Sequence, residues 1–152
     1  MSARGAADGT TDRQVVVGAD GRAKAYRPLP APERIVAVRA GLEAYATGDF
    51  FEAHELMEPA WMGTADPDER SLIQGLIKVA AAEVHAVRGN PAGVRRNLEG
   101  AGDRIAAGRA GGITGVEVDV SALLASIDAR LAALDAEPAR VGEPIPIAWR
   151  MR

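Results

Sequence analysis

The chain has 152 residues, a formal net charge of −3 and no cysteine, so disulfides and thiolate metal sites are excluded. The length favours one domain, and the nearly balanced charge gives no general drive toward nucleic acid. No apolar run is long enough to span a membrane and no secretory signal is visible, so we expect a cytoplasmic protein. Its partner would be an unknown small molecule or a protein, and a homodimer is left open.

The composition favours helices over sheets. Hydrophobic residues make up 47% of the chain but aromatic residues only 4%, and Ala and Leu carry much of the rest. Ala and Leu are strong helix formers, whereas sheets prefer β-branched and aromatic residues. The composition therefore predicts an all-α fold.

The first 30 residues predict a flexible arm. Residues 1 to about 27 are rich in Gly, Ala, Asp, Arg and Thr, a composition that buries little apolar surface. The valines of Val15–Val17 have strand character but no obvious partner in the sequence. Three prolines then form a stiff, extended lead-in. We therefore assign residues 1–30 to the arm and residues 31–136 to a helical domain.

Five helices are predicted in the helical domain. Apolar spacing, first-turn prolines and glycine stops place them near residues 32–47, 49–61, 66–88, 91–107 and 119–134. Asp49 and Glu52 form a capping-box pattern at the second helix. The glycine-rich residues 108–115 predict a mobile connection, followed by an extended Val116–Val118. Since the other connections are short, we expect a compact bundle of about five helices built from two antiparallel helix pairs.

The last segment, residues 137–152, predicts an extended strap. Pro144 and Pro146 exclude a helix around them. The neighbouring Ile145, Ile147 and Trp149 are apolar, so the strap is expected to lie against the helices or against a second subunit.

Polar and aromatic residues share one face of the second predicted helix. His54, Glu58 and Trp61 stand at positions i, i+4 and i+7, which lie on one side of a helix. This face is too polar for an ordinary core stripe and too aromatic for an ordinary solvent face. It is therefore the first candidate for a functional site.

A second polar stripe on the third predicted helix offers further ligands. It contains Arg70, Gln74, Lys78 and His85. If the two stripes face each other, His54, Glu58 and His85 converge, and two histidines with a carboxylate can hold zinc or non-haem iron. Such a metal could activate water for hydrolysis.

This hypothesis assigns a role to most residues of the two stripes. The catalytic and metal-ligating set is His54, Glu58 and His85, and the cofactor would be a divalent metal such as zinc. Glu55 and Gln74 would support the site, Trp61 would form its wall, and Arg70 would pair with Glu55 or Glu58. The residues Arg88, Arg95, Arg96, Arg104 and Arg109 indicate a solvated face rather than a phosphate site.

The alternative is a non-catalytic helical binding or scaffold module. In that interpretation His54 is a buried histidine whose ring nitrogens are satisfied by Glu58 and a backbone group. A buried polar network of this kind fixes the register of helices without catalysis.

The order of these residues resembles a known family. The similarity is carried by Phe51-Glu52-Ala53-His54-Glu55-Leu56-Met57-Glu58 with Trp61, Glu69-Arg70, Gln74-Gly75-Leu76-Ile77, Ala80-Ala81, His85, and Gly89-Asn90 with Gly93. These residues resemble domain-of-unknown-function family 309, a bacterial and archaeal family marked by His-x-x-x-Glu-x-x-Trp. The match covers about residues 35 to 108. The resemblance implies a mainly α-helical fold and a functionally important motif that is suggested to bind metal.

Overall fold

The computed structural model describes residues 15–17 and 23–152, with side chains from residue 26 onward. The described chain forms five helices and two antiparallel strand pairs. The helices are α2 (Ala31–Ala46), α3 (Phe50–Met62), α4 (Pro67–Val87), α5 (Pro91–Gly108) and α6 (Val120–Ala136). The strands are β1 (Val15–Val17), β2 (Ala23–Ala25), β3 (Val116–Val118) and β4 (Trp149–Met151). The predicted all-α bundle is therefore confirmed.

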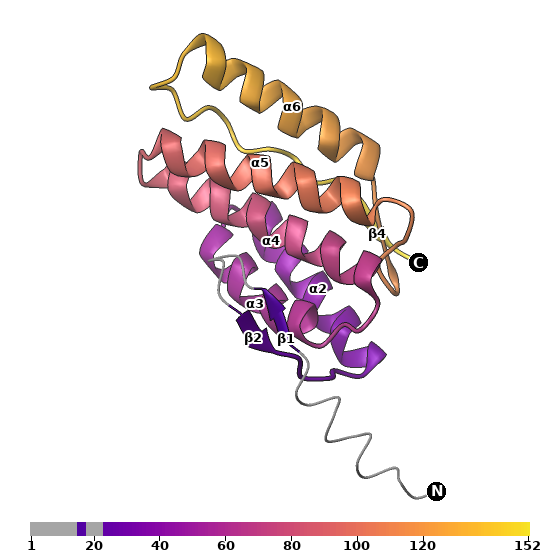
Figure 1. The fold of residues 1–152 in the computed structure, drawn as a ribbon. Coiled ribbons are helices and arrows are strands. Elements are labelled where there is room, and N and C mark those ends of the chain that lie inside the picture. Colours follow the sequence, from indigo (N-terminus) through magenta and orange to yellow (C-terminus); the bar gives the residue numbers. More distant parts are fainter. Residues whose placement is uncertain (1–14, 18–22) are drawn as a thin grey trace, which may run out of the picture.

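Helices that follow one another in the chain pack against one another. α2 packs on α3, α3 on α4, α4 on α5, and α5 on α6 (Figure 1). The closest pairs are α2 with α3 and α4 with α5, which are the two antiparallel pairs expected from the sequence. At Gly75 a Cβ atom would lie only 2.4 Å from Cγ1 of Ile105, so glycine lets α4 and α5 approach closely.

The helix ends lie within two residues of the predicted positions. Asp66, Asn90 and Asp119 each accept a hydrogen bond from a backbone N–H in the first turn of α4, α5 and α6. The predicted capping box of α3 is wrong, because the side chain of Asp49 makes no capping hydrogen bond. In the tight turn between α2 and α3, the backbone N–H of Asp49 instead donates to the carbonyl of Ala44 near the end of α2.

The N-terminal strand has a partner that the sequence did not reveal. β1 pairs antiparallel with β2, with Val15 opposite Ala25 and Val17 opposite Ala23. Ala-Lys-Ala has low strand propensity, which hid this pairing. Tyr26 follows the hairpin and is buried, so the chain docks on the bundle there. The predicted flexibility of residues 1–14 and 18–22 concerns segments outside the described residues.

The glycine-rich connection between α5 and β3 is tied to α4. The carboxylate of the buried Glu69 accepts hydrogen bonds from the backbone N–H of Thr114, at 2.7 Å, and from its hydroxyl, at 3.1 Å. The expectation of a mobile connection is corrected accordingly, since two hydrogen bonds to a buried carboxylate hold its far end. The chain then enters β3, which pairs antiparallel with β4.

The C-terminal strap lies against the helices, as its apolar residues predict. Figure 1 shows the chain after α6 running back along the bundle to β4. Ile145 is 3% exposed and belongs to the hydrophobic core. Its N–H donates to Glu83 at 2.8 Å, and its carbonyl accepts from the Tyr45 hydroxyl at 2.5 Å. The strap is therefore attached to side chains of both α4 and α2.

A buried ion pair lies beneath the strap. Arg130 of α6 donates from Nη1 and Nη2 to the two carboxylate oxygens of Glu83, at 3.0 and 3.1 Å. The remaining guanidinium hydrogen bonds go to strap carbonyls, with Nε donating to Val141 and Nη1 also to Glu143. Because both charged groups are satisfied by each other and by backbone atoms, their burial is tolerated.

Burial raises the pKa of Tyr45 well above its usual range, and the nearby charge of Glu83 raises it further. The hydroxyl therefore stays protonated and remains a donor to the strap across the neutral pH range. Among the helices that the structure describes, none combines the length and the apolar character needed to cross a membrane.

Replacing Arg130 by Met should destabilise the fold and release the strap. The change keeps most of the side-chain volume but leaves the fully buried Glu83 carboxylate without its cation, which costs about 3–5 kcal/mol. Urea unfolding measures the loss, and limited proteolysis should cut residues 137–148 sooner than in the parent protein.

The matched control is Arg140→Met, which removes an arginine whose side chain is 68% exposed. Its effect should stay within about 0.5 kcal/mol. The double variant Glu83→Gln with Arg130→Met should recover part of the loss, because the uncompensated charge is gone. A loss below about 1 kcal/mol in Arg130→Met alone would contradict the role given to this pair.

Candidate functional site

The predicted face of α3 is only partly exposed. The Nδ1 atom of His54 lies 3.1 Å from a carboxylate oxygen of Glu55, and the His54 side chain is 23% exposed. The exposed ring of Phe51 stacks on the imidazole with centroids 6.4 Å apart. Glu58 follows one turn later and is partly buried. Trp61 is 2% exposed and lies in the hydrophobic core, so it is not open to solvent as a pocket wall.

His85 belongs to a different part of the molecule. Its Nδ1 atom lies 3.0 Å from the side-chain amide of Asn90, the residue that caps α5. A Cβ atom at Gly93 would lie 2.4 Å from the same nitrogen, so the imidazole rests on the first turn of α5. His85 therefore faces α5, whereas the predicted site required it to face α3.

Helix lengths explain why the two histidines do not meet. α3 and α4 run back from one short turn between Met62 and Pro67. His54 stands eight residues from that turn and His85 eighteen, which corresponds to about 12 and 27 Å along the helices. The two side chains are thus offset by about 15 Å along the bundle.

The ligand set proposed from the sequence does not fit a metal in this arrangement. Among the residues that the structure describes, no group of three or more His, Asp or Glu side chains is placed to hold a metal ion. His54, Glu58 and His85 therefore form no ready three-ligand centre.

The remaining residues of the α4 stripe support the helix packing. Arg70 donates from Nη1 to the carbonyls of Thr64 and Ala65 in the α3–α4 turn, at 3.3 and 3.2 Å. Gln74 is buried, and with Arg70 it borders a small recess of about 270 Å³ between α4 and α5. Lys78 lies along α5, with its Cδ atom 3.1 Å from where a Cβ of Gly100 would stand.

A larger pocket opens at the end of the bundle where α4 begins and α5 ends. It has a volume of about 650 Å³, within the usual range for small-molecule sites. Leu72, Ile105 and Leu123 line it from three different helices, and all three are core residues. The β3–β4 strand pair and the glycine-rich connection complete its walls. None of the residues assigned to the site from the sequence lines this pocket.

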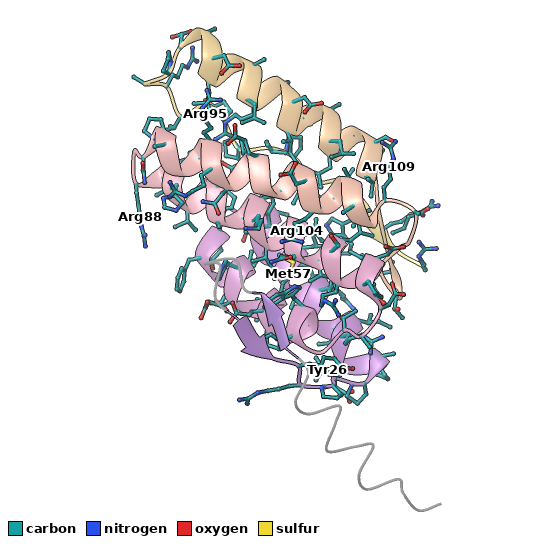
Figure 2. All side chains as sticks on the ribbon, viewed as in Figure 1. Tyr26, Met57, Arg88, Arg95, Arg104 and Arg109 are labelled. Carbon is teal, nitrogen blue, oxygen red and sulfur yellow. The ribbon has the colours of Figure 1, made fainter. Side chains whose placement is uncertain are left out.

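Charged side chains also line this pocket. They are Arg109, Glu117, Asp119, Arg150 and Arg152. Figure 2 shows Arg109 and Arg88 at opposite ends of the bundle, so the arginines read from the sequence as one solvated face do not lie together.

Several residues that shape the structure were missed at the sequence level, although a signal was present. Glu69 and Glu83 fall in register with Leu72, Leu76 and Val79 on the apolar stripe of α4. Arg130 falls in the same way between Ile127 and Leu134 on α6. Opposite charges at core positions of two helices predict a buried ion pair, because an unpaired charge there would be strongly unfavourable.

The comparison with family models confirms the resemblance found in the sequence. Residues 38–97 match the family described as Domain of unknown function (DUF309). The matched range includes α3, α4 and the first part of α5, and therefore His54, Glu58, Trp61 and His85. No curated protein and no solved structure matches the chain.

The pKa of His85 should lie below its ordinary value of 6.5. Burial lowers it first, and the positive charges of Arg96 and Arg88 lower it further. Titration of the imidazole resonances by NMR measures the midpoint, with His85→Gln to assign the signal. Arg96→Gln should raise the midpoint toward 6.5, whereas Arg39→Gln on the distant α2 should leave it unchanged.

The lowered pKa of His85 also makes the stability of the fold depend on pH. Below pH 6.5 the unfolded chain takes up the His85 proton more readily than the folded chain, so this residue makes the fold less stable as the pH falls. A midpoint above 6.5 in the parent protein would show that a carboxylate, rather than burial and arginines, dominates the surroundings of His85.

Proposed function

We propose that the chain is a non-catalytic helical module that binds a small molecule in the pocket at the β3–β4 end of the bundle. The observation that supports this most directly is the pocket itself, a recess of about 650 Å³ lined by core residues of three helices. Concave sites of this size with apolar walls and a few polar groups are typical of ligand binding.

Hydrogen bonds within the chain hold the walls of the pocket. Glu69 fixes Thr114 on one side. On the other side, the N–H of Asp119 donates to the carbonyl of Ala148 at 2.9 Å, next to the paired β3 and β4. A preorganised site loses less conformational entropy when it binds, which favours a binding role for this end of the molecule.

The test is a fragment screen by ligand-observed NMR against the parent protein and a filled variant. Ala148→Trp places an indole at an exposed position that lines the pocket. Fragments that bind the parent protein should give no binding signal with this variant, because their affinity for it is reduced at least about tenfold. Ala132→Trp, at an exposed position of α6 outside the pocket lining, should retain them. Retention of every hit in Ala148→Trp would rule out this pocket as the binding site.

A second candidate function is acid–base chemistry at His54. Its support is the contact between His54 Nδ1 and the Glu55 carboxylate, the arrangement in which a carboxylate orients an imidazole for proton transfer at its other nitrogen. Glu58, one turn away, would complete a hydrolase-like site on α3. This candidate ranks second because the large pocket lies elsewhere and His85 faces α5.

Zinc titration distinguishes metal-free acid–base chemistry at His54 from a metal-dependent hydrolase that uses the same residues. Calorimetry on chelator-treated protein should detect no stoichiometric zinc site, because His54, Glu58 and His85 do not converge. One tightly bound zinc per chain, lost in both His54→Ala and His85→Ala, would instead support a metal-assisted hydrolase. Glu33→Ala, an exposed carboxylate on α2, serves as the control for weak surface binding.

A further inference from the structure

We propose that the ligand of this pocket is an amphipathic anion, a molecule with an apolar body and one carboxylate or similar negative group. This inference rests on the proposed binding function and adds the chemical class of the ligand. Charged side chains around the opening and apolar residues beneath it together favour such a ligand.

Two arginines at the pocket have no acidic partner among the described residues. Arg109 donates from Nη2 to the hydroxyl of Ser121 at 2.7 Å, which holds the guanidinium in place without neutralising it. Nη2 of Arg152 lies 3.3 Å from where a Cβ of Gly112 would stand, so this guanidinium lies over the glycine-rich connection. Both groups therefore keep a full positive charge next to the opening.

Both acidic side chains of the lining have hydrogen-bond partners. Glu117 pairs with Nε of Arg150 across the β3–β4 pair. Asp119 accepts the N–H of Ala122 at 3.0 Å and caps α6. Among the three arginines of the lining, Arg109 and Arg152 are the two that have no acidic side-chain partner within the described part of the chain.

The first residues of α6 add to the same field. Val120 and Ser121 begin this helix and line the pocket. The positive end of the helix dipole therefore lies on the same side as the two guanidinium groups, where the carboxylate of Asp119 offsets part of it. Arginine also suits a carboxylate geometrically, because its planar N–H groups can donate two parallel hydrogen bonds.

The floor of the pocket calls for an apolar body on the ligand. Leu72, Ile105 and Leu123 contribute aliphatic side chains, and Trp149 contributes a partly buried ring beside them. A purely inorganic anion would leave the apolar floor of the pocket exposed to water. A neutral hydrophobic molecule would leave the guanidinium groups without an anionic partner. A molecule with both features complements the whole pocket.

The experiment compares octanoate with 1-octanol, which share a chain length and differ in charge. Titration of ¹⁵N-labelled full-length protein, followed by amide shifts of residues 109–121 and 148–152, gives the site and Kd. Octanoate should bind more tightly than 1-octanol. Arg109→Gln and Arg152→Gln should each weaken octanoate about tenfold, the loss expected for one charge-assisted hydrogen bond, and leave 1-octanol within about twofold.

Arg88→Gln is the matched control, because Arg88 is an exposed arginine at the other end of the bundle (Figure 2). It should leave both probes unchanged. Equal affinity for octanoate and 1-octanol at these amides, insensitive to Arg109→Gln and Arg152→Gln, would overturn the anion inference and leave the binding function standing. If neither probe nor any screened fragment shifts these amides, the proposed function falls as well.

Discussion

The bidentate pair between Glu83 and Arg130 is the contact on which the arrangement of the bundle depends. It joins α4 to α6, and the same two side chains hold the backbone of the strap, which Tyr45 of α2 contacts from the other side. A charge pair removed from water is favourable only when the remaining hydrogen-bonding groups are also satisfied. Here the strap supplies those groups, so the ion pair and the strap require each other.

A second carboxylate on α4 has a similar role at the other end of the helix. Glu69 and Glu83 stand about four turns apart, and each accepts a hydrogen bond from backbone outside the helices. Glu69 holds the glycine-rich connection before β3, and Glu83 holds the strap before β4. Since β3 and β4 pair with each other, the two carboxylates together position the strands that form one wall of the pocket.

The sequence predicted the helical part of this structure well, because local signals determine it. Prolines in the first turn of α4 and α5, with Asp66 and Asn90 before them, located the helix starts. The prolines around Ile145 likewise predicted an extended strap. These features depend on backbone geometry within a few residues, which is the range over which a single sequence is informative.

The candidate site was harder to predict, because it depends on which helix faces pack against each other. His54 and Glu58 share a face of α3, but the partner stripe on α4 turns His85 toward Gly93 of α5. The pocket was not foreseen at all, since its lining comes from segments as far apart as Leu72 and Arg152. The position of the pocket depends on helix lengths and on the distances between packed helices. The spacing of residues within one helix does not predict these quantities.

The strap also has a consequence for the order in which the chain folds. The helix pairs α2–α3 and α4–α5 close across turns of a few residues, whereas Glu83 meets Ile145 across 62 positions. Contacts between distant positions pay a larger loop-closure entropy and form later in folding. Because α4 precedes the strap in the chain, we expect the Glu83 carboxylate to stay hydrated until α6 and the strap pack against it. We expect this late step to remove the charge from water and, at the same time, to close the wall of the pocket.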